Sequence, residues 1–370
     1  MKVLHFYKVF FPDNFGGVEK VIDQISIGAA DLGIESEVLC LTPQKNESLI
    51  EMNGYKVHRV PQLLEIASTP FSTKIFKHFA QLAKDADIIH YHFPWPFADV
   101  VHFATRVHKP TLITYHSDIV KQKGLLKFYK PLMNRFLSDT NCIVATSPNY
   151  VTSSAELSKY SSKVRVIPIG LNKDSYPEPT SERLKYWKNK FKDNFFLFIG
   201  VMRYYKGLHT LIEAAKGIDA PIVIIGSGEP IEQELKVQVQ QLGLNNIHFL
   251  GPVAEEDKVA LLRLCYGVVL PSHLRSEAFG ISLLEGAMYG KPMISCEIGT
   301  GTTYINIHKE TGIVVPPGDS FRLQEAMQFL LERPKEAKIM GLQAEKRYRT
   351  HFTAEKMVRS YVDIYEGLLK

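Results

Sequence analysis

The chain has 370 residues, of which 45% are hydrophobic and 22% charged, and its formal net charge at pH 7 is +5. This composition is that of a globular protein long enough for two domains, and it excludes a disordered chain. No run of 18 apolar residues occurs, so the sequence predicts no transmembrane helix. His5 and Lys8 interrupt the apolar start, which we interpret as a first strand rather than a signal peptide. The four cysteines are scattered through apolar stretches, so we expect buried free thiols and a cytoplasmic location.

Short β-rich runs alternate with helical patterns along the chain, which predicts an α/β fold with parallel sheets. A helical apolar face ending at Gly33 separates the first two expected strands. The strands expected in the first half are 2–9, 36–42, 55–60, 87–92, 110–116, 142–147 and 163–169. Those expected in the second half are 195–201, 221–226, 246–251, 266–272, 292–297 and 311–316. Two doubly wound sheets fit this order better than one.

A polar, proline-bearing stretch at 177–181 looks like a linker, and we place the hinge at about 170–182. The sequence therefore predicts an N-terminal domain over 1–172 and a C-terminal domain over 173–350. The last helical pattern, in 351–370, is expected to return to the first domain.

The most informative segment is 271–292, in which Glu277 and Glu285 flank a Phe-Gly turn that opens a helix. Gly280 permits close backbone approach, and the free N–H groups near 279–282 favour an anion such as a diphosphate. The alternative is that both glutamates are solvated at a helix end.

Residues 276–287, Ser-Glu-Ala-Phe-Gly-Ile-Ser-Leu-Leu-Glu-Gly-Ala, resemble the Glu-x7-Glu signature of family 4 of the retaining GT-B glycosyltransferases. The resemblance implies that Glu277 lies near the donor sugar and that Glu285 holds the ribose hydroxyls. It also implies that the amides of Phe279, Gly280 and Ile281 meet the diphosphate. A carboxylate accepts two hydrogen bonds from a vicinal diol, and the helix dipole favours the diphosphate charge.

Arg203 and Lys206 lie in a loop between a strand and a helix, where two cations can stabilise a leaving diphosphate. Their place matches the basic pair of family 4, although the family commonly has an arginine where this chain has Val201. The alternative is two solvated cations, which the helix dipole disfavours.

Two glycine-rich loops follow strands. Gly226, Ser227 and Gly228 resemble the nucleotide loop of the family, so we count them as donor-binding backbone, with an ordinary tight turn as the alternative. Gly16 and Gly17 match a Gly-Gly pair of the family and would let helix N–H groups approach a phosphate.

His116 ends an expected strand and resembles the histidine of the family that contacts the donor sugar. His90 and His92 share one face of a strand, but packing is the better interpretation than a metal site, and we assign no metal. Asp85 and Asp87 precede a strand and are interpreted as a turn. The sequence lacks a P-loop and a nucleophile elbow, and no nucleic-acid partner is expected.

The resemblance covers nearly the whole chain and implies two Rossmann-like domains facing across a cleft. It also implies hexose transfer from a nucleotide diphosphate sugar to a hydroxyl, with retention of configuration and without a metal or other cofactor. The segments 203–207 and 298–304 look like those of bacterial GDP-mannose-dependent mannosyltransferases of polysaccharide, lipopolysaccharide and O-antigen synthesis. UDP-glucose and UDP-N-acetylglucosamine stay open as donors. A nucleotide-sugar 2-epimerase and a non-catalytic binding subunit are the rival functions.

Basic and large apolar residues interleave over 119–136, which is typical of a peripheral contact with an anionic membrane. Such a contact suits a polyprenyl-linked glycan acceptor at the inner face of the cytoplasmic membrane. A core-packed helix with a solvated basic face is an equally good interpretation. The basic residues are Lys121, Lys123, Lys127, Lys130 and Arg135.

Overall fold

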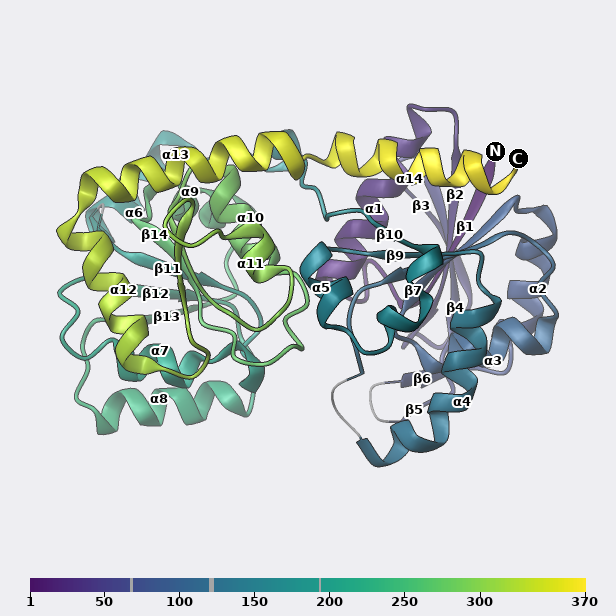
Figure 1. Ribbon diagram of the computed structural model, residues 1–370, viewed down its shortest axis with the longest axis horizontal. Helices are drawn as coiled ribbons and strands as arrows, with labels where there is room; N and C mark the ends of the chain where they lie inside the picture. Colours follow the sequence, from purple (N-terminus) through teal and green to yellow (C-terminus); the bar gives the residue numbers. More distant parts are fainter. Residues whose placement is uncertain (67–68, 120–122, 193) are drawn as a thin grey trace. The chain divides into compact units, whose positions relative to one another are not determined.

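The computed structural model describes residues 1–66, 69–119, 123–192 and 194–370, with side chains left undescribed at 123–125. The chain divides into two compact units. Unit 1 comprises Met1–Gly170 and Ala354–Lys370, and unit 2 comprises Leu171–Thr353 (Figure 1). The first boundary falls inside the expected hinge, and the terminal helix is part of unit 1.

Within its described residues, unit 1 holds an eight-stranded sheet in the order β10-β9-β8-β7-β1-β2-β4-β3. All neighbouring pairs are parallel except β3 with β4. The strands are β1 (Lys2–Val9), β2 (Glu35–Thr42), β3 (Ser48–Met52), β4 (Tyr55–Pro61), β7 (Ile88–Phe93), β8 (Thr111–Tyr115), β9 (Cys142–Ala145) and β10 (Val164–Val166). A separate hairpin joins β5 (Leu64–Ile66) to β6 (Thr69–Phe71).

Helices cover both faces of this sheet, because side chains alternate along each strand. Phe6 on β1 packs against Phe79 of α2, whereas the preceding His5 faces His90 on β7. His90 in turn contacts Tyr365 of α14, so α14 and α2 lie on opposite faces. The helices of unit 1 are α1 (Gly17–Ala30), α2 (Ile75–Asp85), α3 (Pro96–Thr105), α4 (Lys123–Asp139), α5 (Pro148–Ser153) and α14 (Ala354–Leu368), with the 3₁₀ helix η1 (Leu157–Lys163).

Unit 2 holds a six-stranded sheet in its described residues, in the order β13-β12-β11-β14-β15-β16, with every pair parallel. The strands are β11 (Phe196–Ile199), β12 (Ile222–Ile225), β13 (Ile247–Gly251), β14 (Gly267–Leu270), β15 (Met293–Cys296) and β16 (Gly312–Val315). The helices are α6 (Ser181–Phe191), α7 (Leu208–Ala214), α8 (Ile231–Gln241), α9 (Glu255–Leu264), α10 (Ile281–Met288), α11 (Thr302–Ile305), α12 (Ser320–Glu332) and α13 (Pro334–His351), with the 3₁₀ helices η2 (Lys173–Ser175) and η3 (Tyr204–Lys206).

Every strand expected from the sequence occurs, and most are trimmed at one or both ends. Strand β3 was not expected from the sequence, and it forms an antiparallel hairpin with β4. Asn53 and Gly54 connect these strands with φ values of 48° and 84°, the conformation of a tight primed turn. All four cysteines are buried and free, as expected.

The C-terminal half of α4 is packed into unit 1, with Met133, Phe136 and Leu137 buried. Phe128, on an earlier turn, is 88% exposed. Lys121 lies outside the described residues, and so does the side chain of Lys123. Among the described helices, none is both long enough and apolar enough to cross a membrane.

Candidate donor-sugar site and histidine cluster

Three predicted site segments of unit 2 follow neighbouring strands. The loop with Arg203 and Lys206 follows β11, residues 226–228 follow β12, and Glu277 follows β14. Since β12, β11 and β14 are adjacent and parallel, their carboxyl ends meet at one edge of the sheet. The fold therefore gathers segments that are far apart in the sequence.

Lys206 and Glu277 form a close ion pair. Lys206 Nζ donates to Glu277 Oε2 over 2.6 Å, and the two side chains are only 13% and 11% exposed. Ser272 Oγ lies 3.4 Å from the same oxygen. Burial alone would lower the pKa of Lys206, but the Glu277 carboxylate raises this pKa above its ordinary value. Two predicted catalytic residues thus neutralise each other in this structure.

Glu285 lies in the second turn of α10 and is almost wholly buried. Its Oε1 accepts hydrogen bonds from Lys258 Nζ at 2.9 Å and from the Tyr176 hydroxyl at 3.0 Å. Burial opposes the charge of Lys258, but Glu285 and Glu255 hold the Lys258 pKa above its ordinary value. Glu285 Oε2 accepts no hydrogen bond from a residue of the described part. One carboxylate oxygen is therefore fixed and the other remains available to a ligand.

The first turn of α10 offers free amides between these acids. Gly280 is the residue before the helix and has a φ of 98°, which is strained for any residue with a Cβ. The N–H groups of Ile281 and Ser282 donate to no described residue. Phe279 is buried, and Gly301 N donates to Ala278 O at 2.9 Å, which ties the preceding turn to the 298–303 loop. This geometry is that of an anion-binding helix terminus.

The glycines at 226 and 228 have a packing reason. A Cβ at Gly226 would lie 2.2 Å from the Gly200 carbonyl oxygen, and one at Gly228 would lie 2.2 Å from that of Met202. Met202 N donates to Ser227 O at 2.9 Å, so the two loops are joined backbone to backbone. Both glycines are needed for this packing whether or not they meet a nucleotide.

The Arg203 side chain makes no hydrogen bond or ion pair with the part of the chain that the structure describes, and the residue is exposed. Val201, where the family commonly has arginine, is 52% exposed in the same loop. Of the two predicted cations, only Lys206 is therefore held in place by the protein.

Gly16 and Gly17 begin α1 in unit 1, but their surroundings already contain an anion. The Glu19 carboxylate folds back and accepts a backbone hydrogen bond from Gly16 and a side-chain hydrogen bond from Asn14. Burial raises the pKa of Glu19 above its ordinary value, in spite of these bonds. A phosphate at this helix terminus would have to displace Glu19.

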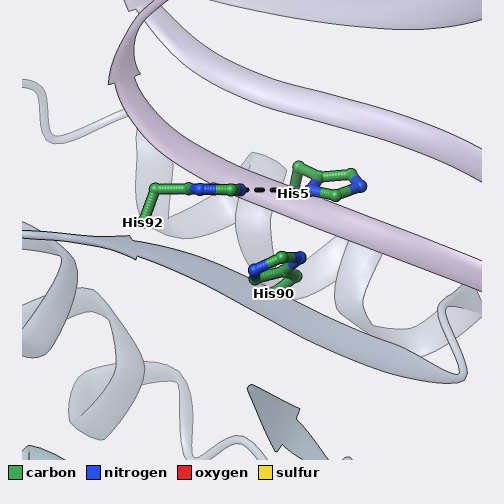
Figure 2. Close-up of side chains that lie close together, drawn as sticks. All are labelled: His5, His90 and His92. Carbon is green, nitrogen blue, oxygen red and sulfur yellow. Dashed lines mark hydrogen bonds between the residues drawn. The ribbon is translucent and has the colours of Figure 1, made fainter. Parts of the chain in front are cut away.

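His116 follows β8 and joins a buried cluster of histidines that the sequence did not bring together. Its Nε2 lies 3.0 Å from His92 Nδ1, and His92 Nε2 lies 3.1 Å from His5 Nδ1. His90 stacks on His92 with ring centroids 4.3 Å apart, and Figure 2 shows it beside the His5–His92 hydrogen bond. His90 and His92 share one face of β7, as predicted. His5 is the member that sequence analysis missed.

His5, His90 and His92 each offer a nitrogen within 4.8 Å of the others, a spacing that also suits a metal ion. However, both His90 nitrogens lie 2.7 Å from hydroxyls, those of Tyr365 and Thr114. The stacked rings of His90 and His92 do not converge on one point. Packing and hydrogen bonding account for these rings, so we assign no metal here.

Comparison with known proteins identifies the family. Residues 15–175 match the family described as Glycosyltransferase Family 4, and residues 182–347 match Glycosyl transferases group 1. D-rhamnosyltransferase WbpZ of Pseudomonas aeruginosa is 55% identical over 354 residues, covering 96% of this chain and 93% of that protein. The chain belongs to the family 4 glycosyltransferases. O-antigen chain mannosyltransferase C of Escherichia coli is 50% identical to this glycosyltransferase, covering 100% of the chain and 99% of that protein.

The GT-B fold class expected for this glycosyltransferase is confirmed by solved structures. Sucrose-phosphate synthase from Thermosynechococcus elongatus superposes with a TM-score of 0.81 at 20% identity, covering 99% of this chain and 98% of that one. HepE of Anabaena, solved in complex with UDP, gives a TM-score of 0.78 at 19% identity, covering 99% of this chain and 100% of that one. Identities this low establish the fold alone.

Sequence reasoning missed two residues that hold Glu285 in the candidate site, Lys258 and Tyr176. Lys258 is only 6% exposed although it lies among acidic residues in the first turns of α9. The sequence signal was that Lys258 directly precedes the apolar run 259–262, which favours burial of the lysine. A buried lysine needs a carboxylate partner. Tyr176 lies in the expected hinge at 170–182 and gave no such signal.

Proposed function

We propose that this glycosyltransferase moves a mannose-type hexose from a GDP-sugar to a hydroxyl of a glycan or lipid-linked oligosaccharide, with retention, in O-antigen synthesis. The observation that carries the donor site is the start of α10, where free amides lie between two carboxylates that each hold a lysine. The names of the two relatives at 55% and 50% identity support the sugar class and the pathway.

Lys206 and the amides of residues 279–281 stabilise the diphosphate as it departs. The donor C–O bond breaks toward an oxocarbenium-like state, so positive charge grows on the sugar while negative charge grows on the diphosphate. Lys206 passes from Glu277 to the diphosphate, which leaves the Glu277 carboxylate facing the developing positive charge. Because Lys206 Nζ and Glu277 Oε2 lie 2.6 Å apart, the role of Lys206 at the diphosphate and that of Glu277 at the sugar depend on each other.

Glu285 accepts hydrogen bonds from the ribose hydroxyls through its free Oε2. Lys258 and Tyr176 keep Oε1 in place, so the carboxylate stays oriented without a ligand. The backbone of Gly226, Ser227 and Gly228 lies along the nucleotide.

Arg203 adds a second cation in place of the arginine that Val201 replaces, and its exposure leaves it free to reach the diphosphate. His116 contacts the donor sugar. Gly16 and Gly17 approach the donor phosphate once Glu19 has moved aside. The chemistry needs no metal or other cofactor, because the cations and amides balance the charge that the leaving group develops.

The acceptor class is a membrane-anchored glycan, and the basic segment 119–136 is the membrane contact. Exposed Phe128 beside Lys127 supports this placement at the inner face of the cytoplasmic membrane. Co-sedimentation with vesicles containing anionic lipid tests it. We expect Phe128→Ser to weaken pelleting, whereas Phe321→Ser, which alters a residue 62% exposed on α12, serves as the control. Equal pelleting of both variants contradicts the membrane contact.

A donor panel followed by a transfer assay tests the function. A ligand at 100 times its Kd stabilises the protein by about 2.7 kcal/mol, so we expect GDP-mannose or GDP-D-rhamnose to raise the Tm and UDP-glucose and UDP-N-acetylglucosamine to leave it unchanged. The rhamnose donor is included because a relative at 55% identity is named a D-rhamnosyltransferase. Stabilisation by the UDP-sugars alone contradicts the proposed donor.

NMR of the products distinguishes the rival functions. Glycosyl transfer with retention gives a product of the donor's anomeric configuration, whereas a 2-epimerase converts the nucleotide sugar without an acceptor. Glu277→Gln and Lys206→Met are expected to abolish transfer. The control is Glu213→Gln on α7, which alters an exposed ion pair and is expected to leave transfer unchanged. Wild-type rates in the first two variants would remove the catalytic assignment.

A further inference from the structure

Three histidines of unit 1 form a continuous hydrogen-bonded chain from the interior to the end of β8. His5 Nδ1 lies 3.1 Å from His92 Nε2, and His92 Nδ1 lies 3.0 Å from His116 Nε2. The ring planes of successive members differ by only 24° and 21°, so each bond runs close to the ring planes. We call His5, His92 and His116 the histidine relay.

The relay consists of neutral imidazoles. Burial lowers the pKa of His5 and of His116 to about 3, and it lowers the pKa of His92 well below the ordinary value. His5 is 0% exposed and His92 is 2% exposed, whereas His116 keeps 8% of its surface exposed. Each ring therefore carries one N–H, and the relay has one end in the core and one near the surface.

Neutral rings leave the relay only two proton arrangements. His92 has a single N–H, so it must donate to one neighbour and accept from the other. In the first arrangement His5 donates to His92 and His92 donates to His116, which leaves an N–H on His116 Nδ1. In the second, every bond is reversed and the spare N–H lies on His5 Nε2. The tautomer of His116 is thus coupled to a ring two hydrogen bonds away.

The interior end selects between the two arrangements. His5 Nε2 is buried and has no hydrogen-bond partner among the described residues. The reversed arrangement would leave a buried N–H without an acceptor, which is rare in proteins, whereas the first leaves only a lone pair there. In the first arrangement the spare N–H lies instead on His116, where a ligand oxygen can accept it.

We propose that His5 and His92 are positioning residues that hold His116 as the Nδ1–H tautomer, so that His116 donates a hydrogen bond to an oxygen of the donor sugar. The contact with the donor rests on the proposed function, but the tautomer does not. His90 takes no part in the relay, since both of its nitrogens are engaged by the hydroxyls of Tyr365 and Thr114. Its ring packs on His92 and keeps that ring in place.

Two substitutions of His5 separate hydrogen bonding from packing. The amide nitrogen of His5→Asn takes a place comparable to imidazole Nδ1 and still donates to His92, although the side chain is smaller. His5→Asp has almost the same size as His5→Asn, but its carboxylate can only accept, so His92 Nε2 must carry the N–H and His116 Nε2 must donate to His92 Nδ1. If packing alone matters, Asn and Asp leave the same His116 tautomer; if the relay matters, only Asp reverses it.

The readout is the tautomer of His116 in the full chain labelled with [15N]histidine, observed by long-range 1H–15N correlation and assigned with His116→Gln. We expect a protonated Nδ1 on His116 in the parent and in His5→Asn, and a protonated Nε2 on His116 in His5→Asp, where His92 Nε2 has an acceptor. His102, whose Nε2 lies 2.8 Å from Asp139 outside the relay, serves as an unchanged internal reference. Thermal unfolding verifies that each variant is folded.

A protonated Nε2 on His116 in the parent overturns the proposal, as does an unchanged His116 tautomer in folded His5→Asp with a neutral His92. Stoichiometric zinc that shifts the His5 and His92 signals and is removed by a chelator also overturns it, in favour of a metal site. In a transfer assay, kcat/KM is expected to fall about fivefold to tenfold more in His5→Asp than in His5→Asn, the size of one lost neutral hydrogen bond. Absence of transfer in the parent contradicts the proposed function and leaves the tautomer result standing.

Discussion

Replacing Lys206 by methionine removes one member of a buried ion pair and leaves the Glu277 carboxylate without its amine. The pair spans 2.6 Å, and its side chains are only 13% and 11% exposed. Removing one partner of a buried pair costs about 3–5 kcal/mol, and the remaining exposure places this case near the lower end, at about 3 kcal/mol. The nearest other donor, Ser272 Oγ, lies 3.4 Å away and cannot neutralise the charge.

The double variant Lys206→Met/Glu277→Gln removes both charges, so its stability is expected to lie within about 1 kcal/mol of the parent. A matched control is the exposed pair of Lys216 and Glu213, which spans 2.7 Å with side chains 50% and 40% exposed. Lys216→Met is expected to cost less than about 1 kcal/mol, because exposed pairs are screened by water.

Tryptophan fluorescence during urea unfolding measures these differences. Of the two tryptophans in the sequence, Trp95 lies in unit 1 and Trp187 in unit 2. A Trp95→Phe background therefore reports on unit 2 alone. With an m-value of about 2 kcal/mol/M, a loss of about 3 kcal/mol moves the midpoint by about 1.5 M. Equal midpoints for Lys206→Met and the double variant would refute the coupling of this pair.

Three further outcomes are expected. Lys258→Met removes one of the two hydrogen bonds that hold Glu285 Oε1 and leaves only that from Tyr176, so calorimetry should show GDP and guanosine both bound about tenfold more weakly. A loss confined to GDP would contradict a ribose role for Glu285. Burial raises the pKa of Glu19 in the folded protein, so stability falls as pH rises from the ordinary value of 4.5 through the raised one. Thermal unfolding across this range should show a smaller decline in Glu19→Gln, and parallel curves would count against the raised pKa. Gly226→Ala places a Cβ 2.2 Å from a carbonyl oxygen and should lower the Tm, whereas Gly243→Ala, which meets nothing within 4 Å, should lower it less; equal losses would contradict the packing role.

Apolar runs predicted the buried strands well, and local chemistry explains where prediction failed. Strand β3, Ser48–Met52, has an exposed or half-buried side chain at every position, so it lacks the apolar run that marks the other strands. The Asn53-Gly54 turn was the stronger signal, because two residues with positive φ connect antiparallel strands. The β3–β4 hairpin at the sheet edge is thus predicted by the residues of its turn rather than by an apolar run in β3.

The acids of the candidate site could be found from sequence because one short segment contains both. Their partners could not, since the fold brings them from a distance. Glu285 meets Lys258 across 27 positions of sequence and Tyr176 across 109. His5 and His92 are 87 positions apart, and His5 looks like one polar residue in an apolar strand. Only the pairing of β1 with β7 places these rings on one face.

The two lysines of the donor site differ in freedom, and this difference matches the two tasks proposed for their carboxylates. Lys258 is held by Glu285 at 2.9 Å and by Glu255 at 2.6 Å, so moving away to a ligand would cost it two carboxylate contacts. Lys206 has one carboxylate partner in the described chain, Glu277, and can exchange it for a diphosphate. A ribose contact needs a carboxylate that stays fixed, whereas a leaving group needs a cation that can move toward growing charge. Under the proposed function, fixed charge therefore lies at the nucleoside end of α10 and exchangeable charge at the end where the bond breaks.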